Sequence, residues 1–123
     1  MKPKKTSFLL GRIKSITYAL KGFYLLITTE HSIITQLIIG VLMCGAGFYF
    51  KITKIEWLFQ IFAIGLVLTA ESLNTAIEAI CDYIQPNFDK KIGFIKDIAA
   101  GAVTFAALTA VIIGAIIYIP KIV

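Results

Sequence analysis

Residues 57–82 of the chain read WLFQIFAIGLVLTAESLNTAIEAICD, and this stretch decides the fold. It is predominantly apolar from Trp57 to Ala70. Four polar residues then follow at intervals of three, four and four, namely Glu71, Asn74, Glu78 and Asp82. The apolar part alone is too short to cross a bilayer, because a spanning helix needs about 20 residues. The pattern therefore predicts a membrane helix over residues 57–82 that carries polar side chains at membrane depth.

Two further apolar segments flank this helix. No charged residue interrupts residues 32–50 or residues 98–119, and each segment is long enough for one crossing. Proline disfavours helical geometry in the residue before it, so Pro86 predicts a loop over residues 83–97. Pro120 is expected to end the last span. The chain thus reads as an all-α integral membrane protein with three transmembrane helices.

The composition agrees with a membrane protein. Of the 123 residues, 59% are hydrophobic and 15% are charged, and the mean hydropathy is +0.89. A soluble globular chain is about a quarter charged. This chain has too little polar surface for a water-soluble fold, and its length predicts one domain over residues 1–123.

A fourth helix is expected ahead of the first span, over residues 7–28. Its apolar residues recur at alternating intervals of four and three: Leu9, Ile13, Ile16, Leu20, Phe23 and Ile27. Arg12, Lys14 and Lys21 lie off this stripe and make a crossing of lipid costly. The pattern predicts an amphipathic surface helix in the membrane interface, although a helix packed on a partner outside the membrane has the same pattern.

The cations are unevenly distributed. Nine of the twelve Lys and Arg residues precede the first span or lie in residues 83–97, which are on one side of a three-span protein. Positively charged segments favour the cytoplasm, so we expect a cytoplasmic amino terminus. Lys2, Lys4 and Lys5 suit anionic lipid headgroups, and no nucleic-acid fold signature accompanies them. No signal peptide is expected, so the whole chain is taken as mature protein.

Small residues recur every four positions in the last span, at Ala102, Ala106, Ala110 and Gly114. This register lets helices approach closely in lipid, either between subunits or within one subunit. Cys44 and Cys81 lie in predicted spans without further metal ligands at suitable spacing, and we interpret them as packing residues.

The polar residues of the central span point to metal and phosphate chemistry. At 100° per residue, the row from Glu71 to Asp82 covers an arc of about 80° on one helix face. Carboxylates this close repel one another unless they are protonated or share a cation. A hard divalent metal with oxygen ligands fits, and Mg²⁺ commonly shares its coordination with substrate phosphates. Glu30, at the same membrane boundary, is a further candidate ligand.

Residues that follow the row extend this reading towards a nucleotide. Lys96 precedes the last span and can meet phosphate as a point charge, with Asp97 beside it. The sequence has no G-x-x-x-x-G-K-[ST] or G-x-G-x-x-G motif, so an ATP site in this chain differs from the common ones.

The string Glu71-Ser72-Leu73-Asn74-Thr75-Ala76-Ile77-Glu78 with Asp82, followed by Lys96-Asp97-Ile98-Ala99-Ala100-Gly101, resembles the prokaryotic diacylglycerol kinase family. That family includes undecaprenol kinases. The resemblance extends from Tyr18 to the third span. It implies a homotrimeric lipid kinase of the bacterial cytoplasmic membrane, with a surface helix and three spans per subunit, that moves the γ-phosphate of MgATP to a lipid hydroxyl.

The resemblance also implies roles for individual residues. Glu71 matches the catalytic base, and Glu30 and Glu78 match metal-binding glutamates. Nucleotide contacts are implied for Glu30, Glu78, Lys96, Asp97, Tyr18 and Arg12. Asn74 and Asp82 match supporting polar residues of the same site.

Three points stay open. The family's lipid is diacylglycerol or undecaprenol, and both lipids offer apolar chains. The sequence departs from the family pattern at His31 and Asp89, to which we assign no role. A non-enzymatic ion-conducting or transport subunit is the alternative, because intramembrane carboxylates also line ion pathways.

Overall fold

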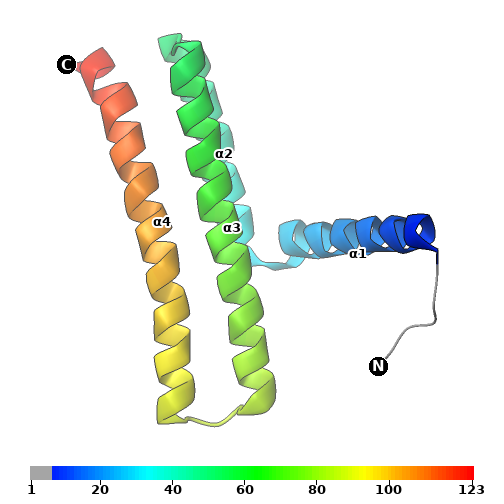
Figure 1. The fold of residues 1–123 in the computed structure, drawn as a ribbon. Helices are drawn as coiled ribbons and strands as arrows, with labels where there is room; N and C mark the ends of the chain where they lie inside the picture. Colours follow the sequence, from blue (N-terminus) through cyan, green and yellow to red (C-terminus); the bar gives the residue numbers. More distant parts are fainter. Residues whose placement is uncertain (1–6) are drawn as a thin grey trace.

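The computed structural model describes residues 7–123, which form four helices. They are α1 (Phe8–Thr29), α2 (His31–Phe50), α3 (Lys54–Ile84) and α4 (Lys90–Ile122). The last three run side by side, whereas α1 leaves the start of α2 crosswise (Figure 1). Each of these three is long and apolar enough to span a membrane. Lys2, Lys4 and Lys5 lie outside the described residues.

The turn between α2 and α3 is fixed by caps at the ends of both helices. Lys51 ends α2 with a left-handed backbone conformation, φ 53°. Thr53 Oγ1 accepts from the Glu56 amide at 3.2 Å, and Glu56 Oε1 accepts from the Thr53 amide at 2.9 Å. This reciprocal capping box starts α3 at Lys54, three residues before the expected Trp57.

The loop between α3 and α4 is shorter than expected. The Asp89 carboxylate accepts hydrogen bonds from the amides of Lys91 and Ile92, at 3.0 and 3.1 Å, and so caps α4. The predicted loop over residues 83–97 is therefore wrong beyond Asp89, and Lys96 and Asp97 lie on a helix. At the other end, α4 continues through Pro120 to Ile122.

The helix α2 is shorter than α3 and α4, so only part of the α3–α4 hairpin lies beside it. At 1.5 Å per residue, the 20 residues of α2 measure about 30 Å, which equals the hydrocarbon thickness of a bilayer. The 31 residues of α3 and the 33 of α4 measure about 46 and 50 Å. Both continue beyond the first residue of α2 (Figure 1). We call residues 74–104, the part of this α3–α4 hairpin beyond α2, the hairpin extension.

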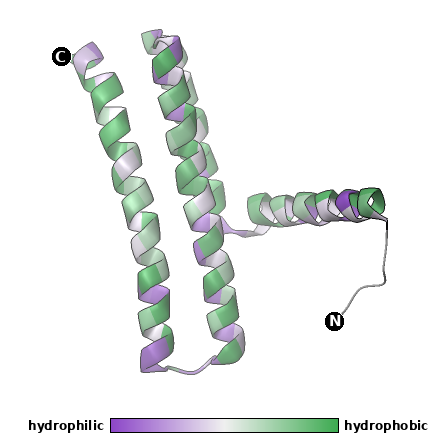
Figure 2. Ribbon diagram, viewed as in Figure 1, coloured by the Kyte–Doolittle hydropathy of each residue, from purple (hydrophilic) through white to green (hydrophobic). Residues whose placement is uncertain are grey.

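Hydropathy follows the same division. Apolar residues dominate the lengths of α3 and α4 that run beside α2, and hydrophilic residues gather towards the tip of the hairpin extension (Figure 2). We call the end where α2 begins the acidic end. The end with the α2–α3 turn and the carboxyl terminus is the opposite end.

A hydrophobic cluster connects the three long helices at the opposite end. Ile52, Ile117 and Tyr118 form a buried cluster there. Gly47 lies directly against the Trp57 indole, since an added Cβ would come within 2.7 Å of the ring. Of the small residues in α4, Ala106 is buried, while Ala102 is exposed. Part of this stripe therefore packs within the subunit.

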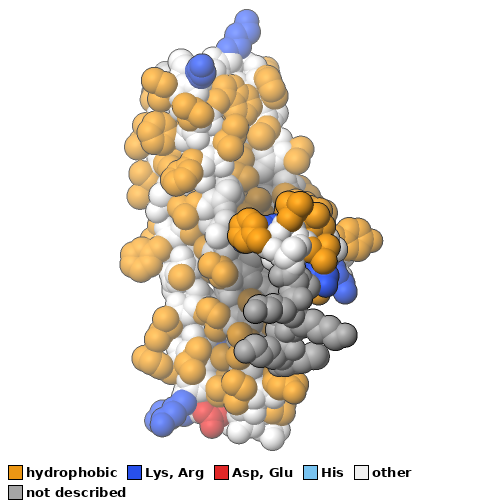
Figure 3. All heavy atoms as spheres, turned by 45° about the vertical axis from the view of Figure 1, so that its right-hand side comes forward, with side chains coloured by type: hydrophobic (Ala, Val, Ile, Leu, Met, Phe, Trp, Pro, Cys, Tyr) orange, Lys and Arg blue, Asp and Glu red, His pale blue; other side chains and the backbone are white. Residues whose placement is uncertain are grey.

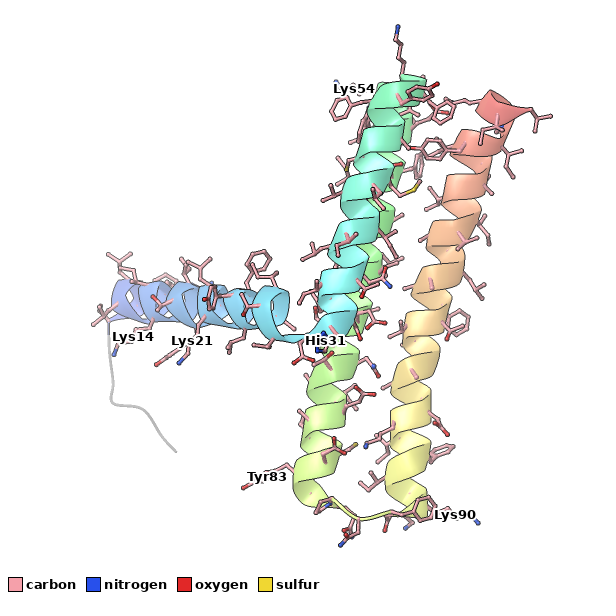
Figure 4. The ribbon with its side chains drawn as sticks, turned by 180° about the vertical axis from the view of Figure 1, so that it is seen from behind. Lys14, Lys21, His31, Lys54, Tyr83 and Lys90 are labelled. Carbon is pink, nitrogen blue, oxygen red and sulfur yellow. The ribbon has the colours of Figure 1, made fainter. Side chains whose placement is uncertain are left out.

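The apolar stripe of α1 is exposed from Leu9 to Phe23, so nothing in residues 7–123 covers it. Lys14 and Lys21 extend from α1 towards the side of the hairpin tip (Figure 4). On the face drawn in Figure 3, hydrophobic side chains cover most of the long helices, and Lys or Arg side chains gather at the two ends and on α1. Whether α1 is an amphipathic interfacial helix stays a prediction.

Candidate active site

The predicted acidic row lies on one uninterrupted helix. Residues 71–82 all belong to α3, so the spacing of three, four and four holds the four polar side chains on one side. Glu71 is half-buried, whereas Glu78 and Asp82 are exposed. The exposure of the carboxylates therefore increases from the membrane part of α3 into the hairpin extension.

Contacts between α2 and α3 set the level of Glu30 along α3. A Cβ added at Gly40 would lie 3.2 Å from Ile64 Cγ2, so these two residues face each other. The helices are antiparallel, and ten residues further towards the acidic end on each of them Glu30 is level with Asn74. Figure 4 shows the neighbouring His31 at this junction beside α3. Glu71 and Glu78 lie about one helical turn to either side of that level.

Contacts between α3 and α4 bring Lys96 to the same row. The Lys96 ammonium donates to Asp82 Oδ1 at 2.5 Å. This hydrogen bond raises the pKa of Lys96 above its usual value, and the nearby charge of Glu78 acts in the same direction. The side chains are 35% and 62% exposed, so the pair is open to solvent and to a ligand. Asp97 is exposed beside it.

Asn74 has an unusual environment. Its Oδ1 atom is buried and has no hydrogen-bond partner within residues 7–123. Buried polar atoms are nearly always paired, and an exception calls for an explanation such as a bound ion or a functional role. Asn74 is therefore a candidate for a contact with a group outside the described residues.

The donor set suits Mg²⁺ even though one chain does not enclose a metal. No group of three or more His, Cys, Asp or Glu side chains is positioned to hold an ion in the part of the chain that the structure describes. Two carboxylates, Glu30 and Glu78, nevertheless lie near the level of the unpaired Asn74 oxygen. All three offer oxygen, and Mg²⁺ usually takes only one or two protein carboxylates together with phosphate and water.

Two predicted nucleotide contacts are not brought to the row within the chain. Arg12 and Tyr18 are exposed on α1, which leads away from α3 (Figure 1). Along that helix they lie about 27 and 18 Å from Glu30. The Arg12 guanidinium instead lies over the Phe8 ring, 5.9 Å from its centroid.

The sequence reading missed a polar cluster at the opposite end. Gln60 is buried, its amide donates to the Met43 carbonyl at 3.1 Å, and its side-chain oxygen accepts from the Tyr118 hydroxyl. We call these three residues the closing cluster. An amide in the apolar run after Trp57 was the available signal. Nearby, Lys121 donates to Glu56 at 2.9 Å.

Fold and site together define an integral membrane protein with a carboxylate-rich, lysine-containing site at one end of its spans. A family model described as prokaryotic diacylglycerol kinase matches residues 17–118. Since this match covers most of the chain, the protein belongs to that family, and it is a membrane lipid kinase. The family resemblance noted in the sequence is thereby confirmed, and the alternative of an ion-conducting subunit is displaced.

Individual relatives point the same way. The undecaprenol kinase of Bacillus subtilis is 33% identical over 108 residues, which cover 88% of this chain and 88% of that protein. A diacylglycerol kinase of Synechocystis is 30% identical over 107 residues, covering 86% of this chain and 61% of that protein. The diacylglycerol kinase of Haemophilus influenzae is 27% identical over 115 residues, covering 93% and 98%. These names include both lipid acceptors.

Proposed function

We propose that this protein transfers the γ-phosphate of MgATP to the hydroxyl of diacylglycerol or undecaprenol, giving phosphatidic acid or undecaprenyl phosphate. The observation that carries the proposal is the position of half-buried Glu71. It lies on α3 close to the level where α2 begins, with the Lys96–Asp82 ion pair further along the same side. A base at the lipid boundary and a cation in the hairpin extension are what phosphoryl transfer from a water-soluble nucleotide to a membrane alcohol requires.

In this mechanism the Glu71 carboxylate accepts the proton of the lipid hydroxyl. The lipid oxygen forms a bond to the γ-phosphorus while the bond from that phosphorus to the β–γ bridging oxygen breaks, and ADP leaves. The charge of Glu71 favours the proton transfer. Its half-buried position limits access of water, which would compete as the acceptor.

Glu30 and Glu78 hold Mg²⁺ in this proposal, with Asn74 and Asp82 as supporting polar residues. When bound, Mg²⁺ neutralises charge on the phosphates. Asn74 Oδ1 has no partner in the chain and is an available oxygen at that level. Asp82 holds Lys96 in position through their ion pair.

Lys96 and Asp97 contact the nucleotide, together with Tyr18 and Arg12 from α1. The last two lie far from the row in a single chain, so the proposal requires a homotrimer in which α1 has an acidic row of a neighbouring subunit within reach. The exposed apolar stripe of α1 is in keeping with such an arrangement at the membrane surface.

We further propose that the protein lies in the bacterial cytoplasmic membrane with its amino terminus and hairpin extension in the cytoplasm. Nine of the twelve Lys and Arg residues lie in the segments that this orientation makes cytoplasmic or places at that membrane surface. ATP then reaches Lys96 from the compartment in which it is made.

The decisive test is Glu71→Gln in purified protein, assayed with radiolabelled ATP and each lipid. Loss of the base should lower turnover by about 10²-fold or more while nucleotide binding persists. Glu56→Gln is the matched control, because it makes the same change at the opposite end of the same helix. It should retain turnover. Wild-type phosphoryl transfer by Glu71→Gln refutes the role of the base.

A further inference from the structure

The turn between α2 and α3 carries two lysines that no carboxylate of the described chain neutralises. Lys51 and Lys54 are exposed on either side of this turn, and we call them the cationic patch. The salt bridges among residues 7–123 are Lys96–Asp82 and Lys121–Glu56, so neither lysine of the patch has a salt-bridge partner there. The patch is therefore open to a negative group from outside the chain.

The nearest carboxylate is fully used elsewhere. Glu56 is the only acidic residue between Glu30 and Glu71 in the sequence. Its Oε1 atom accepts from the Thr53 amide and its Oε2 atom accepts from the Lys121 ammonium, each at 2.9 Å. A rotation of Glu56 towards the patch would break both the capping box and this ion pair. The opposite end thus keeps an excess of positive charge at its surface.

Lys54 occupies a position that its own helix disfavours. The carboxyl end of a helix attracts cations, so Lys51 suits the end of α2, whereas the amino end of a helix repels them. Lys54 is the first residue of α3 and lies at the extremity of the molecule (Figure 4). An anion beside Lys54 would offset this repulsion.

Aromatic rings next to the patch indicate its depth in the membrane. Phe48 and Tyr49 are 75% and 80% exposed, and the half-buried Trp57 ring packs on Phe48 with centroids 4.9 Å apart. Aromatic side chains gather where the hydrocarbon meets the lipid headgroups. Because α2 measures about 30 Å and ends directly before Lys51, the patch lies at the level of the lipid phosphates.

We propose that the cationic patch binds the phosphate of an anionic phospholipid, such as phosphatidylglycerol, in the leaflet at the opposite end. A zwitterionic phospholipid carries its own cation beside the phosphate and gains less from the two lysines. Attraction by each lysine at a membrane surface raises the affinity for an anionic lipid about fivefold. This lipid is a bound neighbour and not the substrate, because Lys54 is 17 residues, about 26 Å, from Glu71 along α3.

The chain contains its own reporter for this contact. Trp57 is the only tryptophan in the sequence. Lys54 and Trp57 are three residues apart on α3, which places them on the same side of the helix. Tryptophan fluorescence therefore reports the lipids that touch this part of the protein.

The test reconstitutes the full-length protein in phosphatidylcholine vesicles that contain brominated phosphatidylglycerol or, at the same fraction, brominated phosphatidylcholine. Bromine on a lipid quenches indole fluorescence on contact. The wild type should prefer phosphatidylglycerol about fivefold or more at low ionic strength, and 1 M salt should lower this preference towards one.

Variants with matched changes of charge assign the preference to the patch. Lys51→Gln/Lys54→Gln should reduce it to about one, with quenching by brominated phosphatidylcholine unchanged. Lys14→Gln/Lys21→Gln is the control, because it removes two lysines from α1, which meets α2 at the acidic end. This control should keep the wild-type preference.

Equal quenching by the two brominated lipids in the wild type overturns the proposal, as does an undiminished preference in Lys51→Gln/Lys54→Gln. Inorganic pyrophosphate added at constant ionic strength should leave the preference intact. If it abolishes the preference, the patch takes a soluble polyanion and the proposal is overturned. The measurement requires no turnover, so its outcome does not depend on the kinase function proposed above.

Discussion

The buried polar groups at the two ends of the α2–α4 unit differ in whether they have hydrogen-bond partners. At the opposite end, Gln60 is paired with Tyr118 and with the Met43 carbonyl, and Glu56 is paired with Lys121. At the acidic end, Asn74 Oδ1 is buried without a partner, and Glu71 is half-buried at the membrane boundary. Satisfied polar groups stabilise a fold, whereas unsatisfied ones persist where function requires them. The comparison favours the acidic end as the place of the proposed chemistry.

Replacing Asn74 should have the largest effect on turnover after replacement of Glu71. Asn74→Leu removes an unpaired buried oxygen, so the thermal midpoint in detergent should rise, with a gain of about 1 kcal/mol in unfolding free energy. Turnover should fall by about 10²-fold because a positioned polar group is lost from the site. Unfolding scans and kinase assays on the same preparation measure both. A lower midpoint would mean that Asn74 is already paired in the assembled protein.

Lysine substitutions at the two ends should separate activity from stability. Lys96→Met should raise KM for ATP about tenfold or more through loss of a phosphate contact, with little change in stability because the Lys96–Asp82 pair is exposed. Lys121→Met removes the partner of Glu56 at the opposite end and should leave KM for ATP unchanged. Equal effects of the two changes on KM for ATP would contradict the prediction that only the acidic end binds the nucleotide.

Disrupting the closing cluster should lower the free energy of unfolding, whereas replacing Asn74 should raise it. Tyr118→Phe deletes a donor to buried Gln60 and should cost about 1–3 kcal/mol of unfolding free energy. Adding Gln60→Leu should recover part of that loss, because the double variant leaves fewer buried polar atoms unpaired. Denaturation of the two single variants and the double variant forms the required cycle. Additive losses would show that the two side chains act independently.

Glycine substitutions should change stability without changing the chemistry, and the two changes should differ in sign. Gly47→Ala forces a Cβ to within 2.7 Å of the Trp57 ring and should destabilise the opposite end by about 1–3 kcal/mol. Gly93, in the hairpin extension, has nothing within 4 Å of an added Cβ. Gly93→Ala should stabilise by up to about 1 kcal/mol through helix propensity. Similar midpoints for the two variants would argue against a close contact between Gly47 and Trp57.

Helix boundaries were the part of the fold that hydropathy misplaced. From the sequence, the last span was predicted to begin directly after the last charged residue of the loop. Lys96 and Asp97 were therefore assigned to the loop. The helix instead begins where Asp89 caps it, because backbone capping acts without regard to the membrane. Thr53 similarly starts α3 before the aromatic residue taken as its boundary. A spanning helix can continue into water. Hydropathy therefore predicts which residues lie in the lipid but not where the helix begins and ends.

The sequence by itself determined three apolar helices, a further helix ahead of them and one face of α3 with three carboxylates and an amide. These features follow from local composition and from helical periodicity, which need no knowledge of neighbouring segments. Only the tertiary structure decided that Glu30 is level with Asn74 and that Lys96 bonds to Asp82. It likewise paired Gln60 with Tyr118. Such pairings depend on the register between helices, which packing at positions such as Gly40 and Gly47 sets and which no single helix encodes.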